Sequence, residues 1–206
     1  MRNQFTTIKD MKNLVIALLI ALVSTTTFAQ KGKTATSSSS LASFENLKAE
    51  IISEGGKQKL AIIIDNAGKK ENVILKELTT KDKAQQPTNF KISSFTVSGV
   101  KLYHFTYTEN IKTETKLKKE NALVTTNEIW DFSSTKVKIL GNIQTVSNIK
   151  EIKQLGKSAA TETVEKTRRE GFEFTLTKDY EVHLSTKNQL NKYKFNPQTR
   201  RYDPKK

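Results

Sequence analysis

The sequence predicts a mainly β fold: a single antiparallel β-sandwich or open-barrel-like domain with one or two short helices. Short runs of β-branched and aromatic residues recur along the chain and are separated by turn-forming residues. Apolar and polar residues alternate most regularly in the segments 172–176 and 180–184. Such alternation is typical of a hairpin with one buried face, and its recurrence favours an antiparallel sheet.

The N-terminal end of the chain predicts export. The apolar run 14–23 is ten residues long, whereas a membrane span needs roughly 20. It follows Lys12 and precedes the small residue Ala29, which is the arrangement of a secretory signal peptide. We therefore expect residues 1–29 to be a signal peptide, with Met11 as an alternative start.

The predicted mature chain begins at Gln30 and has two parts. Residues 30–40 form a Ser/Thr-rich linker without large apolar residues. Residues 41–206 form the single β-rich domain, with no further transmembrane span. We expect a bacterial protein that is exported to the periplasm or secreted.

Two segments leave helix and strand both open. In 41–54, the spacing of Leu41, Phe44, Leu47 and Ile51 favours a helix that ends at Gly55-Gly56, and a strand is the alternative. In 149–155, an apolar residue at every third position likewise suggests a short helix.

The remaining elements are predicted as strands. The strand-like segments are 60–64, 73–78, 90–97, 100–108 and 137–143, and the segment 117–132 suggests a further pair of strands. The polar segment 157–170 is a long loop, a solvated helix or an edge ribbon protected by charge. The sequence Asn196-Pro197 predicts a type I turn near the C-terminal end.

The composition indicates a basic protein without disulfides. The chain contains no cysteine, and its net charge is +14, or +12 once the predicted signal with its net +2 is removed. Such a charge favours an anionic envelope polymer as a partner, and another envelope protein is the alternative.

The best local candidate for binding is a basic patch around the last predicted hairpin. Its cations and aromatic residues are Lys192, Lys194, Arg200, Arg201, Tyr193 and Tyr202. Cations interleaved with aromatic rings are typical of surfaces that bind anionic polymers.

The alternative site is a sugar subsite at the single tryptophan. Glu128 and Asp131 flank Trp130, and acids beside an aromatic ring suit sugar binding, although a lone tryptophan is commonly a core residue. The sequence contains neither a catalytic triad motif nor a metal-ligand cluster. We therefore predict no catalytic residue, no metal, no cofactor and no nucleotide.

These observations favour a non-catalytic exported binding module over an enzyme. Two alternatives remain open: a polysaccharide-acting hydrolase, and an envelope assembly or structural factor that pairs a strand edge with its partner.

Overall fold

The computed structural model describes residues 40–79, 86–133, 136–156 and 160–205, all within a unit that spans Ser38–Lys206. The predicted signal peptide and nearly all of the predicted linker lie outside the described residues. Within these ranges every regular element is a strand, which confirms the mainly β class. The described residues contain no helix that is long and apolar enough to cross a bilayer.

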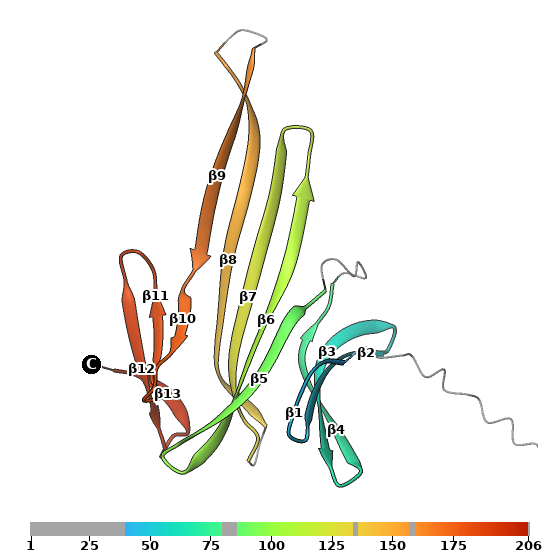
Figure 1. The fold of residues 1–206 in the computed structure, drawn as a ribbon, viewed down its shortest axis with the longest axis vertical. Coiled ribbons are helices and arrows are strands. Elements are labelled where there is room, and N and C mark those ends of the chain that lie inside the picture. The colour runs from blue at the N-terminus through green and yellow to red at the C-terminus, as the bar shows by residue number, and fades with distance from the viewer. Residues whose placement is uncertain (1–39, 80–85, 134–135, 157–159, 206) are drawn as a thin grey trace, which may run out of the picture. The chain divides into compact units, whose positions relative to one another are not determined.

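The strands form three antiparallel sheets in simple sequence order (Figure 1). The N-terminal sheet contains β1 (Ser40–Phe44), β2 (Leu47–Glu54), β3 (Lys57–Asn66) and β4 (Lys69–Glu77). The central sheet contains β5 (Thr88–Val97), β6 (Val100–Glu114), β7 (Lys118–Asp131), β8 (Val137–Gln154) and β9 (Thr161–Gly171). The C-terminal sheet contains β10 (Glu173–Leu176), β11 (Val182–Ser185), β12 (Leu190–Asn196) and β13 (Arg201–Pro204).

The two helix predictions are wrong. Residues 41–54 form β1 and β2, because the chain reverses at Glu45-Asn46 and pairs Phe44 with Leu47. Residues 149–154 belong to β8, where Ile149 is 2% exposed while Ile152 is 42% exposed. An interval of three residues places these two isoleucines on opposite faces of a strand, so their spacing mimics helical periodicity without a common buried face.

The core has two parts, one on each face of the central sheet. Phe105 and Tyr107 of β6 join a cluster with Leu47, Leu60 and Ile62 of the N-terminal sheet. Neighbouring side chains of a strand point to opposite faces. Accordingly, Leu102 of the same strand joins a second cluster, whose other members include Ile129, Val182, Phe195 and Tyr202. The apolar residues of β6 therefore pack against the N-terminal sheet on one face and against the C-terminal sheet on the other.

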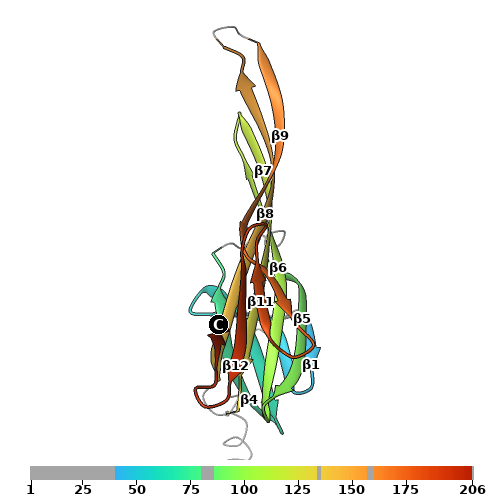
Figure 2. The same ribbon diagram turned by 90° about the vertical axis from the view of Figure 1, so that its left-hand side faces the viewer.

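The far part of the central sheet has no such cover. We call residues 110–124, 143–156 and 160–171 the extension; neither core cluster contains any of them. Figure 1 shows β6, β7, β8 and β9 side by side here, and Figure 2 shows the twist of the same strands. The extension therefore presents both of its faces to solvent.

Candidate functional site

One face of the extension carries regular rows of side chains across four strands. Residues that lie opposite each other on antiparallel strands share a face. The first row consists of Asn110, Leu123, Val146 and Arg169; the second of Lys112, Asn121, Asn148 and Thr167; and the third of Glu114, Lys119, Lys150 and Glu165. We call this surface the amide face, after the exposed Asn121 and Asn148 at its centre.

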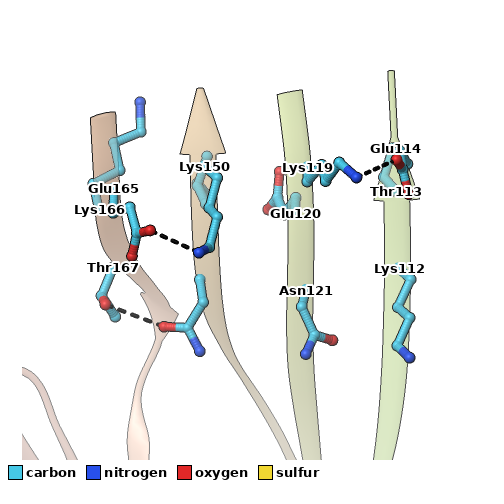
Figure 3. A pocket seen from close by; sticks show the side chains of 12 residues that line it. Lys112, Thr113, Glu114, Lys119, Glu120, Asn121, Lys150, Glu165, Lys166 and Thr167 are labelled. Carbon is cyan, nitrogen blue, oxygen red and sulfur yellow. Dashed lines mark hydrogen bonds and ion pairs between the residues drawn. The ribbon is translucent and has the colours of Figure 1, made fainter. Parts of the chain in front are cut away.

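The amide face contains a shallow depression of about 530 Å³ (Figure 3). At its floor, Thr167 Oγ1 donates a hydrogen bond to Asn148 Oδ1 over 3.2 Å. Lys119 pairs with Glu114 at 2.6 Å, and Lys150 pairs with Glu165 at 2.7 Å. The two lysines are opposite each other in the register, but each turns toward its own carboxylate (Figure 3). The depression therefore combines exposed amides with paired charges and with Lys112, which forms no ion pair in the described residues.

Exposed aliphatic side chains concentrate on the extension. Ten large hydrophobic residues of the described chain are notably exposed, and six of them belong to the extension: Ile111, Leu117, Leu123, Ile143, Ile152 and Leu155. On the amide face, Leu123 and Ile152 are each 42% exposed and lie on either side of the amide row. Exposed apolar groups around a polar centre are a common feature of protein-binding surfaces.

The opposite face of the extension is closed by its own charged side chains. Ile149 and Ser147 are almost fully buried there. Around them, Arg168 pairs with Glu120, and Lys166 pairs with Glu151. A hydrogen bond from Lys118 lowers the pKa of Glu120, and one from Lys166 lowers the pKa of Glu151. The charges of this face are therefore paired with one another, although Ile111 and Ile143 are exposed on it.

The structure divides the predicted basic patch. Lys192, Lys194 and Arg201 are exposed, and none of them forms an ion pair within the described residues. The cross-strand pairs place all three on one face of the C-terminal sheet. The predicted aromatic members, Tyr193 and Tyr202, instead pack against the core on the other face. Tyr202 donates its hydroxyl hydrogen bond to the backbone oxygen of Tyr180, and burial raises the pKa of Tyr202.

The fourth cation of the predicted patch, Arg200, joins two sheets. Arg200 Nε donates to Asp131 Oδ2 over 2.7 Å, while Ser133 donates to Asp131 Oδ1 from its nitrogen and its hydroxyl. Burial raises the pKa of Asp131, but the Ser133 donors and Arg200 outweigh it and hold the pKa below its usual value. Arg200 of the predicted basic patch and Asp131 of the predicted sugar subsite thus form one structural ion pair.

The predicted sugar-subsite residues also lie inside the fold. Trp130 is 7% exposed and belongs to the core cluster that contains Phe105. Its Nε1 donates to Glu128 Oε2 over 2.8 Å, and Lys138 Nζ lies 2.8 Å from Glu128 Oε1. Both carboxylates of the predicted subsite, Glu128 and Asp131, are therefore buried and engaged in ion pairs.

The two histidines of the described residues lie apart from these surfaces. His104 packs on Phe174 with ring centroids 5.0 Å apart, and burial lowers its pKa despite a hydrogen bond with Asn127. His183 Nε2 lies 3.7 Å from Glu181 Oε2. No group of three potential metal ligands occurs among the described residues.

The amide face was missed from the sequence, because its residues come from four strands and become neighbours only through the register. Comparisons with protein-family models, with curated proteins and with solved structures found no match to this chain.

Proposed function

We propose that the protein is an exported, non-catalytic binding module of the bacterial envelope, and that it binds another protein on the amide face. The observation that carries this proposal is the concentration of exposed aliphatic residues on a part of the central sheet outside both core clusters. These residues occur on both faces of the extension, and the depression beside Asn121 and Asn148 favours the amide face. Sheets in folded proteins normally bury at least one face. A protein partner would bury the amide face.

The composition of the extension favours a protein over a glycan as the partner. Its residues 110–124 and 143–171 include no tryptophan, tyrosine or phenylalanine, so no ring is available for stacking on a sugar. The amide face offers aliphatic side chains, two amides and ion pairs instead. Apolar groups mixed with hydrogen-bonding groups match the composition of protein–protein interfaces.

Site-specific photo-crosslinking in the native host tests the proposed surface. A photoreactive residue at position 123 should give a discrete crosslinked protein in the envelope fraction, because Leu123 lies on the amide face in the row next to Asn121. The matched control is position 190, since Leu190 is also an exposed leucine, 53% exposed, but on the C-terminal sheet. We expect no discrete product from position 190.

A second substitution checks that the crosslink reports on binding. Adding Ile152→Asn to the protein labelled at position 123 should reduce the crosslinked product about tenfold, the effect of losing roughly 1.4 kcal/mol of contact energy. The melting temperature should stay unchanged, because Ile152 is exposed. Equal products from positions 123 and 190, or no product from position 123, would contradict the proposal.

A second candidate function, binding of an anionic polymer, rests on Lys192, Lys194 and Arg201. Most cations of the central sheet have carboxylate partners, whereas these three share an exposed face without an ion pair in the described part of the chain. Cations without partners are available for salt-dependent contacts with phosphate, sulfate or carboxylate groups.

Affinity for heparin or lipopolysaccharide, measured over a series of salt concentrations, tests this candidate. Replacing the three cations by glutamine should lower the slope of log affinity against log salt by about 3, roughly one unit for each lost contact. The control variant carries Lys119→Gln, Lys150→Gln and Lys166→Gln, an equal change of charge at residues that already form ion pairs. Equal losses in both variants would exclude the C-terminal sheet as the site.

A further inference from the structure

The edge of the central sheet at β9 is open along its whole length. β9 pairs with β8 through eleven consecutive residues without a bulge, and no described strand pairs with its other side. It contains no proline, and its only glycine is the terminal Gly171. The outward backbone groups of β9 therefore form an uninterrupted row that can accept another strand.

The side chains of β9 decide which strand fits. The segment 161–167 reads Thr-Glu-Thr-Val-Glu-Lys-Thr. When two copies of one edge strand pair antiparallel, a two-fold axis runs perpendicular to the sheet, and every contact occurs twice. With the axis at Val164, Glu162 lies opposite Lys166 of the partner subunit, and Val164 lies opposite its own copy.

Neighbouring registers do not offer this match. An axis at Glu165 places Glu162 opposite Arg168 but also places the Glu165 carboxylate against its own copy. An axis at Lys166 places Lys166 against itself and Glu162 against Glu170. An axis at Thr163 pairs no opposite charges. Like charges directly opposite each other destabilise a strand pair, and opposite charges stabilise it. Among these four registers, only the axis at Val164 places opposite charges together without a like-charge pair, so charges that normally protect an edge would here favour that register.

We propose that two copies of the chain associate through β9, in antiparallel register centred on Val164, to form one continuous sheet. The axis perpendicular to the sheet keeps corresponding faces on the same side. The two amide faces would therefore join into one wider surface. This inference concerns the edge rather than the face and does not depend on the protein partner proposed above.

Molar mass in solution, measured by sedimentation equilibrium from micromolar to millimolar protein, tests the proposal. The purified protein should be a dimer at the upper concentrations. Glu162→Lys replaces two attractive pairs by two repulsive ones and should weaken the dimer about tenfold or more. The double variant Glu162→Lys with Lys166→Glu restores opposite charges in the same register and should recover the dimer, even though it removes the ion pair of Lys166 with Glu151.

The matched control is Glu170→Lys, because Glu170 lies on the same strand and face but outside the segment 161–167. It should leave dimerisation unchanged, and circular dichroism should show that every variant is folded. A monomer at all concentrations would overturn the proposal, as would a dimer that Glu162→Lys does not affect. Neither result bears on the crosslink from position 123, so the two proposals fail separately.

Discussion

Gly171→Ala should lower the free energy of unfolding by about 3 kcal/mol. Gly171 ends β9 with a backbone φ of 78°, a region that costs an L-residue free energy. A Cβ atom there would lie 2.2 Å from the backbone oxygen of Ile143, so β8 would have to shift. Because only Phe172 separates Gly171 from the start of β10, that shift would also disturb the passage of the chain from β9 to β10.

Urea unfolding of the natural protein and of the Gly171→Ala variant measures this effect. Thermal unfolding should show that the midpoint of the variant is lower by about 10 °C. Gly141→Ala is the matched control, since Gly141 also lies in the central sheet. A Cβ atom at position 141 would meet only the flexible Lys138 side chain, at an ordinary 3.6 Å or more, and the cost should stay below about 1 kcal/mol. Equal losses at the two glycines would refute the steric explanation.

Arg200→Ala should lower the free energy of unfolding by about 3 kcal/mol at neutral pH. The Asp131 side chain is only 3% exposed, and removing Arg200 leaves its carboxylate buried without a cation. The neighbouring Arg201 supplies the control, because it is exposed and forms no ion pair in the described residues. Arg201→Ala should change stability by less than about 0.5 kcal/mol.

The pH dependence of the stability lost in Arg200→Ala identifies the cause of that loss. In the natural protein, Asp131 has a lowered pKa, so its contribution is present above the unfolded-state pKa and declines as the pH falls through the folded-state value. Without Arg200 the folded-state pKa of Asp131 rises, and protonation removes the uncompensated charge. The cost of Arg200→Ala should therefore shrink between about pH 6 and pH 3. An equal cost at both ends of this range would show that lost packing is responsible.

Several local features were predictable because they depend on neighbours in sequence. The alternation in 172–184 predicted a hairpin, and β10 and β11 indeed pair Phe174 with Leu184. The Asn196 side chain accepts a hydrogen bond from the nitrogen of Gln198, which stabilises the predicted turn. The segment 161–170, for which a charged edge ribbon was one of three alternatives, is the edge strand β9.

The candidate sites were less predictable, because exposure and partners depend on distant strands. Arg200 and Asp131 are 69 residues apart, and no local pattern indicates that they form an ion pair. The amide face combines residues of β6, β7, β8 and β9 whose rows exist only in one register. A shift by one residue would send each of these side chains to the other face.

Taken alone, the sequence determined the strand-rich class, the turns and the positive charge of this protein, since each depends on composition or on residues close along the chain. Tertiary structure alone decided that 41–54 and 149–154 are strands and that the extension lacks cover. It also decided that Trp130 is a core residue. The segment 47–54 pairs with β3, and the segment 149–154 pairs with β7 and β9, so each receives hydrogen bonds from another strand. Those bonds outweigh a weak local preference for helix.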